Sequence, residues 1–468
     1  MSKKKNRSLS SFTILLLIIV ALAAITWFIP EVEQATLANV VMAPYYGFID
    51  AIDVCIFILV LGGYLSVVTK TGALNAGVNA LVRKLHGNEL VLIPILMIIF
   101  AIGGTTFGFA EETLGFYALI CTAMVAAGFD TLVATGAIIL GAGVGCLGST
   151  VNPFATGIAS DVLVSLGINV NQGTVIMIGL ILLVVNLTIA ILYVMRYARK
   201  VKEEKGSILS AKETLAMEHT YRQEEKKEEV HFNGKMKLIL AIFGVTFLVM
   251  VIAVIPWSAF LGEEVYTQFF GWSSILNAAP LGEWWFGELA MWFFIMAIVV
   301  GIIGKLSEKE IVDAFLFGAS DIVSVVLIIA VARGASVLMS QTGLDVYFLE
   351  TAASLLRNVS VLIFAPLSYV IYIGLSFLIP SSSGCATVTM PIMGPLTQGL
   401  NFDPAVMILI FSAASGLVNL FTPTSGVVMG GLSIAKVEYG TWIKWVWKCV
   451  AMIGVASCVI LTVAMMML

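Results

Sequence analysis

Residues 379–395 read IPSSSGCATVTMPIMGP, and this polar stretch rich in helix-breaking residues lies between two strongly apolar segments. LIFAPLSYVIYIGLSFL (362–378) comes before it, and AVMILIFSAASGLVNLF (405–421) follows a few residues after it. Non-helical backbone inside a membrane is stable only where it is buried in protein or lines a water-filled cavity. The stretch therefore predicts a broken helix whose freed backbone groups and hydroxyls line a binding site.

The composition predicts an integral membrane protein. Of the 468 residues, 60% are hydrophobic and 12% are charged, and the mean hydropathy is +1.03. Soluble domains are roughly half apolar and about a quarter charged. The cysteines have no metal-binding or disulfide spacing, and the sequence has no phosphate-binding loop. We therefore expect no metal, no cofactor, no nucleic-acid partner and no ATP-driven step.

Hydropathy and basic residues predict the organisation of the chain. The first predicted span (12–29) follows the basic segment MSKKKNR, so the N-terminus is predicted to be cytoplasmic. Basic clusters after later spans fall on this same side only if two long apolar segments enter and leave on one side. The predicted domains are an N-terminal span and loop (1–49), a first repeat (50–198), a charged cytoplasmic linker with two connecting spans (199–317) and a second repeat (318–468). The linker's charge run reads as a solvated connector.

An internal repeat supports this division. Three landmarks recur in the same order at nearly constant spacing: Thr71-Gly72 with Thr342-Gly343, Glu111 to Thr113 with Thr387 to Thr389, and Asn152-Pro153 with Thr422-Pro423. The crossing count gives the two copies opposite orientations, and inverted repeats with broken helices are typical of secondary transporters. The predicted fold is an all-α polytopic membrane protein with two inverted-topology repeats. Each repeat has a re-entrant helical hairpin (90–128 and 361–398) and a broken transmembrane helix (131–166 and 404–436).

The candidate binding residues lie where these segments are interrupted. Exposed carbonyls, hydroxyls and half-helix N-termini suit a carboxylate or a hard cation such as Na⁺. A single polar cluster of this kind is more typical of helix packing, but four clusters at symmetric positions favour binding. The predicted substrate- or ion-binding residues are Thr106, Glu111, Glu112, Thr113, Ser149, Thr150, Asn152, Arg333, Ser381, Ser382, Ser383, Thr387, Asn419, Thr422, Thr424 and Ser425.

The charged members of this set decide which solute is expected. An ionisable side chain at membrane depth is costly and usually has a partner or a function. Glu111 and Glu112 are expected to attract an ammonium, a guanidinium, a coupling ion or a proton. Arg333 is expected either to bind a carboxylate or to pair with these acids. The tryptophan-rich segment between the two connecting spans is interpreted as interfacial anchoring rather than a binding cage.

Four motifs resemble one known family. PSSSGCATVTMPIMGPL (380–396), NLFTPTSGVVMGGLSIAKVEYGTWIKW (419–445), FGFAEETLGFY (107–117) and GSTVNPFATGIAS (148–160) are similar to the YfcC-like family of candidate basic amino acid antiporters, which is grouped with the C4-dicarboxylate anaerobic carriers. The resemblance covers nearly the whole chain. It implies the ion-transporter superfamily fold, a homodimer of two-repeat protomers and an elevator motion. The Ser-Asn-Thr motifs of the dicarboxylate carriers are not strictly kept here, which leaves Na⁺ or H⁺ open as the coupling ion.

The predicted function is secondary transport of a small organic solute across the bacterial plasma membrane. The first expectation is a basic amino acid of the arginine or ornithine type, moved by exchange or with an ion gradient. The alternative is a C4-dicarboxylate or other carboxylate carrier. A passive channel is a further alternative, which saturation and counter-transport would distinguish. An intramembrane hydrolase using Ser381, Ser382 or Ser383 is not expected, because no histidine lies in a predicted span.

Overall fold

The computed structural model describes residues 11–74, 76–77, 89–204, 206–221, 233–255, 257–357 and 359–468. The N-terminal segment MSKKKNR and residues 222–232 of the charged linker lie outside these residues. Every regular element in the described part of the chain is a helix. Eight of these helices are long and apolar enough to cross a membrane. The chain is therefore an all-helical, multi-pass membrane protein.

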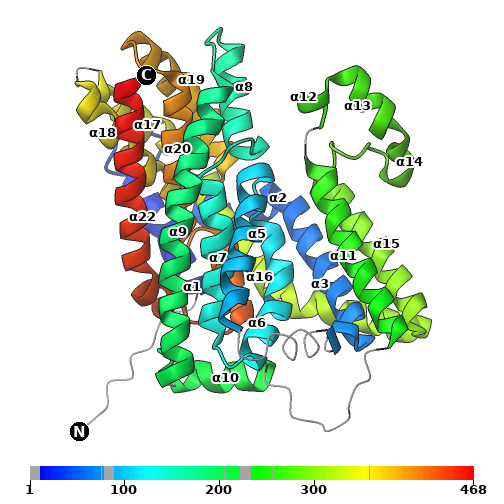
Figure 1. Ribbon diagram of the computed structural model, residues 1–468. Coiled ribbons are helices and arrows are strands. Elements are labelled where there is room, and N and C mark those ends of the chain that lie inside the picture. Colours follow the sequence, from blue (N-terminus) through cyan, green and yellow to red (C-terminus); the bar gives the residue numbers. More distant parts are fainter. Residues whose placement is uncertain are drawn as a thin grey trace, which may run out of the picture.

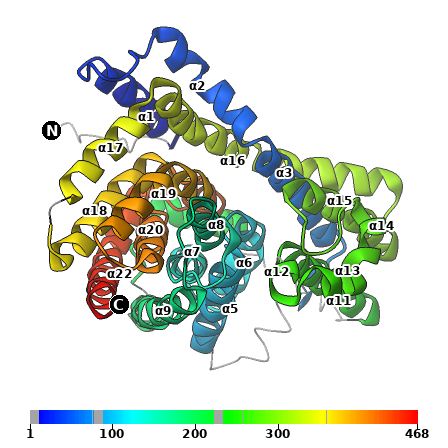
Figure 2. The ribbon, with the colours of Figure 1, turned by 90° about the horizontal axis from the view of Figure 1, so that it is seen from above.

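Seven helices form an elongated layer, which we call the outer arm (Figure 2). They are α1 (Ser11–Thr26), α2 (Leu37–Asp50), α3 (Ile52–Lys70), α11 (Gly234–Val254), α15 (Phe286–Gly304), α16 (Glu308–Thr342) and α17 (Leu344–Leu356). The long helix α16 packs along both α2 and α3. At Gly62 and Gly318 the two backbones come so close that a Cβ on either glycine would lie within 2.8 Å of the other's carbonyl oxygen. Small residues allow such close packing of membrane helices.

Short helices α12 (Trp257–Leu261), α13 (Glu263–Phe270) and α14 (Ser274–Asn277) cover one end of α11 and α15 (Figure 1). Backbone hydrogen bonds from Gly282 and Trp284 to the Ala253 carbonyl, 2.8 and 3.2 Å long, tie the returning chain to the end of α11. The next residue, Trp285, precedes α15, and its backbone N–H donates to Glu288 Oε2 (2.9 Å). The start of α15 is thus held at the same membrane face as α12–α14.

A second group of helices is compact and lies beside the arm, and we call it the inner bundle (Figure 2). They are α5 (Leu92–Phe107), α6 (Tyr117–Ala126), α7 (Thr131–Leu147), α8 (Ile158–Ser165), α9 (Gln172–Glu204), α18 (Val361–Leu378), α19 (Ser382–Gly399), α20 (Pro404–Val418), α21 (Gly426–Ala435) and α22 (Tyr439–Met467). Helix α7 packs against α20, and α9 packs against α22. The most deeply buried helices, α7 and α20, run through the middle of this bundle.

Four interruptions divide helices of the inner bundle, and each coincides with a local sequence signal. Between α5 and α6, Gly108 adopts a left-handed backbone (φ 73°), which favours glycine, and a 3₁₀ turn (Glu111–Phe116) follows. A π-helical turn (Pro153–Gly157) precedes α8. The gap between α18 and α19 contains Pro380, and the gap between α20 and α21 contains Pro423. Proline removes a backbone donor and ends a helix before it.

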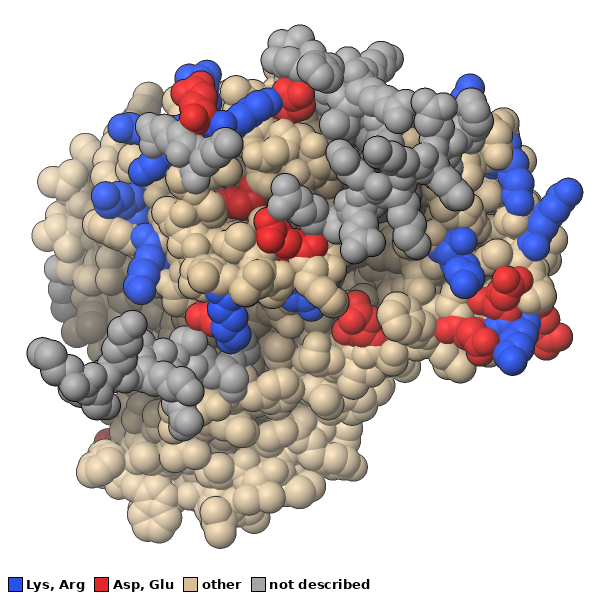
Figure 3. Space-filling view, turned by 90° about the horizontal axis from the view of Figure 1, so that it is seen from below, with Lys and Arg blue, Asp and Glu red and all other residues tan. Residues whose placement is uncertain are grey.

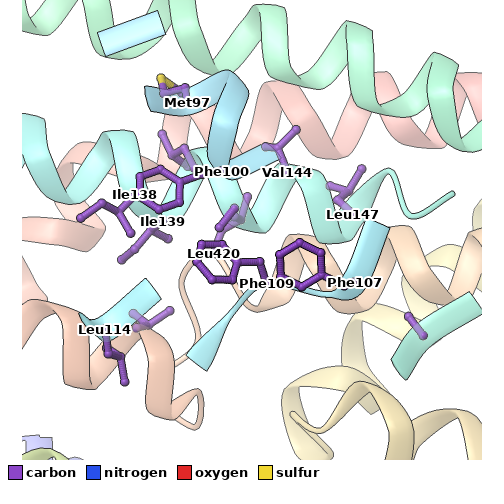
Figure 4. Packing of buried hydrophobic residues seen from close by; sticks show 14 of the residues in the cluster. Met97, Phe100, Phe107, Phe109, Leu114, Ile138, Ile139, Val144, Leu147 and Leu420 are labelled. Atoms are coloured by element: carbon purple, nitrogen blue, oxygen red, sulfur yellow. The ribbon is translucent and has the colours of Figure 1, made fainter. Parts of the chain in front are cut away.

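Apolar packing holds the first interruption against the bundle. Phe109 stacks on Phe100 with ring centroids 5.9 Å apart, and Phe107 lies 5.4 Å from Phe109. Figure 4 shows these rings beside Leu420, which follows α20. The two interruptions, far apart in sequence, therefore share one buried cluster.

The described part of the linker, residues 206–221, packs on the bundle along one face and is exposed on the other. Helix α10 (Ala211–Tyr221) lies under the inner bundle (Figure 1). Glu213, only 2% exposed, accepts hydrogen bonds from the backbone N–H groups of Ser210 (2.7 Å) and Glu438 (2.8 Å). Burial alone would raise the pKa of Glu213, but these hydrogen bonds outweigh it, so the pKa is lowered. Apolar residues of α10 pack against the bundle, because charged residues keep only their own faces of a helix in contact with water.

A buried aspartate joins the linker to the bundle at the same face. Asp130 caps α7 and accepts hydrogen bonds from the hydroxyls of Tyr197 and Ser207, each 2.6 Å long. Burial raises the pKa of Asp130, and these hydrogen bonds oppose the rise. Figure 3 views the molecule from this side and shows Lys and Arg side chains distributed over the face.

Candidate binding site

A cavity of about 180 Å³ lies where the interruptions of the inner bundle meet α3, α15 and α16 of the outer arm. Eleven of the sixteen predicted binding residues line it. They are Glu111, Glu112, Thr113, Asn152, Arg333, Ser381, Ser382, Ser383, Asn419, Thr424 and Ser425. The structure thus brings together residues from both halves of the chain. Thr106, Ser149, Thr150, Thr387 and Thr422 do not line the cavity.

The acids come from the turn between α5 and α6. Glu112 is 5% exposed, and its Oε2 accepts a hydrogen bond from the Ala110 N–H (3.1 Å). Glu111 is partly exposed beside it. Within the residues that the structure describes, no ion pair is formed by either acid. A buried carboxylate is stabilised by a cation beside it, so these two acids are candidate ligands for a positively charged group.

Hydrogen bonds fasten the end of α5 to the interruption between α7 and α8. The Thr105 hydroxyl donates to the Gly148 carbonyl (2.6 Å), and the Thr150 N–H donates to the Thr105 carbonyl (3.1 Å). Asn152 Nδ2 donates to Ser149 Oγ (3.1 Å), while its Oδ1 accepts from the Phe154 N–H (2.9 Å). Thr150 therefore joins the two segments, whereas Ser149 bonds within its own segment, and both lie outside the cavity lining.

Two further predicted hydroxyls bond to their own helices. The Thr106 hydroxyl donates to the Ile102 carbonyl (2.6 Å) in α5. The Thr387 hydroxyl donates to the Ser383 carbonyl (2.9 Å), one turn inside α19. Such bonds to the preceding turn are common for threonine in helices. Both threonines are therefore ordinary helix residues that do not line the cavity.

The gap between α18 and α19 is joined to the interruption between α20 and α21 in a comparable way. Asn419 Nδ2 donates to the Pro380 carbonyl (3.3 Å), and the Thr424 hydroxyl donates to the Phe377 carbonyl (3.1 Å). Thr422 lies behind Thr424, with 2.7 Å between their hydroxyl oxygens. These bonds leave Ser381, Ser382 and Ser383 at the cavity wall.

Two helices begin at the cavity, and their N-termini make its electrostatic potential more positive. Ser381 caps the 18-residue helix α19, and its Oγ accepts from the Gly384 N–H (3.3 Å). The 10-residue helix α21 starts at Gly426, which also lines the cavity. Helix N-termini carry partial positive charge and free N–H groups, so they favour a carboxylate.

Arg333 adds a full positive charge from α16. Its Nε lies 3.8 Å from Asp50 Oδ2, a long and partly exposed ion pair. The expected alternative of pairing with Glu111 or Glu112 is not what the structure has; in the described residues Asp50 is the acid at Arg333. Partly exposed pairs of this kind contribute little stability. The guanidinium therefore stays at the cavity wall as a candidate carboxylate ligand.

Several lining residues were not predicted from the sequence. Ser412 and Cys146 lie inside uninterrupted helices, where no local signal separates them from packing residues. Phe154 and Trp285 line the cavity with their ring centroids 4.7 Å apart. The tryptophan-rich segment is interpreted as an interfacial anchor, and Trp285 is an exception because it lines the cavity. Phe154 lies within the GSTVNPFATG motif, so its position next to Asn152 could have identified it.

Comparison with known proteins identifies the family of the chain. The family model described as DcuC, C4-dicarboxylate anaerobic carrier, matches residues 34–466. The chain belongs to the DcuC family. An uncharacterized protein of Haemophilus influenzae is 31% identical to this DcuC-family chain over 412 residues, which cover 87% of the chain and 75% of that relative. YfcC of Escherichia coli K12, a candidate basic amino acid antiporter, is 28% identical over 414 residues, covering 85% of the chain and 74% of YfcC.

Solved structures of membrane transporters have a similar extent but a distant likeness. The Neisseria gonorrhoeae efflux pump MtrF is 15% identical, with 98% of the DcuC-family chain and 95% of MtrF covered and a TM-score of 0.42. The Alcanivorax borkumensis transporter YdaH is 13% identical, with 97% of each chain covered and a TM-score of 0.44. The DcuC family and the named relative YfcC are transporters rather than enzymes, so the chain is a membrane transporter.

Proposed function

We propose that this DcuC-family chain is a secondary transporter of a cationic amino acid in the bacterial plasma membrane. The observation that carries the proposal is one cavity with two kinds of charge. Glu111 and Glu112 suit an ammonium or guanidinium group, whereas Arg333 and the N-termini of α19 and α21 suit a carboxylate. An amino acid with a basic side chain carries both groups. The similarity to YfcC supports this class of solute.

The proposal includes two inverted repeats. It is supported by contacts between segments that would be equivalent: α3 with α16, α7 with α20, and α9 with α22. Asn186 Nδ2 donates to Ser457 Oγ (2.9 Å), and these residues are 271 positions apart. Cys55 Sγ and the Val326 carbonyl, also 271 positions apart, are in contact at 3.9 Å. Thr71 and Thr342 have this same separation, and equivalent residues meet where a two-fold axis passes.

Each hairpin is proposed to be re-entrant, because its two ends lie together. Before α5, Glu89 forms a 2.5 Å ion pair with Lys202; after α6, Asp130 accepts a hydrogen bond from Ser207. Both ends of the first hairpin therefore meet the same end of α9. At the second hairpin, the rings of Phe364 and Phe402 lie 4.8 Å apart. The face with α10 is proposed to be cytoplasmic, as the positive-inside rule predicts.

Transport is proposed to occur by movement of the inner bundle along the outer arm. Gly426 and Gly430 of α21 face the side-chain ends of Ile329 and Val325 in α16, with the added Cβ positions 2.5 and 2.6 Å from them. This contact differs from the backbone-to-backbone approach of Gly62 and Gly318 inside the arm. Side chains that rest on glycines do not interlock two backbones, so this surface can shift, and the resemblance to elevator transporters agrees with this. A homodimer, which the family resemblance implies, is part of the proposal.

A second candidate function is carriage of a C4-dicarboxylate. The family description and the positive contribution of Arg333 with two helix N-termini favour it. Purified protein in liposomes, preloaded with unlabelled solute, separates the two. Saturable exchange of labelled arginine, with no exchange of labelled succinate, is the result expected for an amino acid antiporter. The reverse pattern would replace the first proposal by the second, and imposed Na⁺ or pH gradients would identify the coupling ion.

A further inference from the structure

We propose that Trp285 and Phe154 form, with Glu111 and Glu112, a subsite that binds the cationic side-chain group of the solute through an aromatic face. This inference rests on the proposed function and adds the residues that select a guanidinium over a neutral group of the same shape. All four residues line the cavity.

The aromatic pair joins the two parts of the molecule. Trp285 belongs to the outer arm, where its backbone caps α15. Phe154 belongs to the inner bundle, in the π-helical turn before α8. Their rings are tilted by 56° with centroids 4.7 Å apart, and Phe286 lies 5.6 Å from Trp285. Trp285 is 47% exposed, so packing leaves part of its ring free to contact a ligand.

The turn that carries the acids contacts Phe154 of this pair. A Cβ on Gly108 would lie 2.8 Å from Phe154 Cδ2, so the Phe154 ring packs directly on the turn that leads into Glu111 and Glu112. Glu112 is buried and has no cation in the described residues. The cavity therefore combines aromatic faces with two carboxyl groups that have no cationic partner among the described residues.

The chemistry favours a planar cation. Aromatic faces attract cations electrostatically, tryptophan most strongly, and a guanidinium can stack on the ring while its N–H groups bond to carboxylates. A urea group has the same shape as a guanidinium but no charge. Trp285 should consequently raise the affinity for arginine more than that for citrulline.

The experiment compares inhibition of labelled arginine exchange by unlabelled arginine and by citrulline. In the Trp285→Ala variant, we expect the affinity for arginine to fall by about 2- to 30-fold while that for citrulline changes little. Trp285→Phe should retain part of the preference, because phenylalanine offers a weaker π-face. Phe154→Leu, which keeps an apolar side chain of similar size, should reduce the preference in the same direction. Trp272→Ala is the matched control, because Trp272 is 62% exposed in the same segment and does not line the cavity.

Equal losses for arginine and citrulline would mean that Trp285 only closes the cavity, and unchanged arginine affinity would mean that it makes no contact. Either result overturns the inference while leaving the proposed function intact. If wild-type protein exchanges no arginine, the proposed function itself fails, and the inference fails with it. Should Trp285→Ala not fold, the Trp285→Phe and Phe154→Leu variants decide by the same comparison.

Discussion

The ring of Phe364 lies 4.8 Å, centroid to centroid, from the ring of Phe402, although helices α18 and α19 separate them in the chain. Phe364 is in the first turn of α18, and Phe402 follows the end of α19. The two ends of the α18–α19 hairpin therefore lie side by side. A re-entrant hairpin requires this arrangement, but two helices that each cross the membrane would also show it.

Cysteine labelling tests the topology. We expect single cysteines at Ser360, Asn401 and Ile275 to react with an impermeant maleimide added outside intact cells. A cysteine at Lys212, in α10, should react only after permeabilisation. The reason is that both ends of the α18–α19 hairpin lie at the same face as α14, whereas α10 lies at the opposite face. Labelling of the Ser360 and Asn401 positions from opposite sides of the membrane would contradict a re-entrant hairpin. Labelling of the Lys212 and Ile275 positions from the same side would contradict the proposed orientation of the protein.

Neutralising Glu112 should weaken transport of a cationic solute. The Glu112→Gln change keeps the shape and the acceptor for the Ala110 N–H but removes the ability to carry a negative charge beside a bound cation. We expect the affinity for arginine in proteoliposome exchange to fall roughly 10- to 100-fold, because hydrogen bonds to charged groups contribute about 1.5–3 kcal/mol. Asp161→Asn, an exposed change outside the cavity lining, is the matched control. Unchanged arginine exchange by Glu112→Gln would remove this residue from the mechanism.

Filling the contact between α21 and α16 should slow movement without removing binding. In Gly430→Ala the new Cβ would lie 2.6 Å from Val325 Cγ1, so the two helices could no longer pass freely. We expect a lower maximal exchange rate at unchanged arginine binding to detergent-solubilised protein, and recovery of the rate when Val325→Ala is added. Loss of binding and rate together, with no recovery, would indicate a folding defect instead. Gly62→Ala should cause such a defect, since its Cβ would meet the Gly318 carbonyl at 2.8 Å.

Removing the Thr105 hydroxyl should lower stability. Thr105→Val takes away the 2.6 Å hydrogen bond to the buried Gly148 carbonyl and leaves that acceptor without this donor. An unsatisfied buried polar group costs about 1–3 kcal/mol, so the apparent melting temperature in detergent should fall. Thr122→Val is the control, because the Thr122 hydroxyl bonds only to its own helix, at the Ala118 carbonyl, and is exposed. Equal melting temperatures for both variants would mean that the tip is held by other contacts.

Acid should release α10 from the bundle. The pKa of Glu213 is lowered in the folded protein, because its hydrogen bonds outweigh the effect of burial. A lowered pKa contributes stability above the ordinary value of 4.5, and this contribution is lost as the pH falls through the lowered value. We expect limited proteolysis near residues 206–221 to increase below pH 4.5 in wild-type protein. Glu213→Gln should be cleaved already at pH 7, with less change on acidification; pH-independent protection in both proteins would contradict this role.

Much of the architecture was predictable because the signals are local. Glycine at position 108 and the prolines at 153, 380 and 423 act on the backbone beside them, so the interruptions coincide with the expected stretches. Hydropathy predicted a multi-pass helical protein for the same reason, since a span depends on a continuous apolar segment.

The set of residues that line the cavity depends on long-range packing, which no local sequence pattern encodes. Trp285 and Phe154 meet only because the outer arm lies against the inner bundle. Arg333 is near Asp50 rather than the acids at 111 and 112, because α2 and α16 pack side by side. The sequence by itself determined where the helices break and which polar groups become free there. Only the tertiary structure decided which of those groups face a common cavity, because a hydroxyl bonds to whichever partner the packed helices bring within reach.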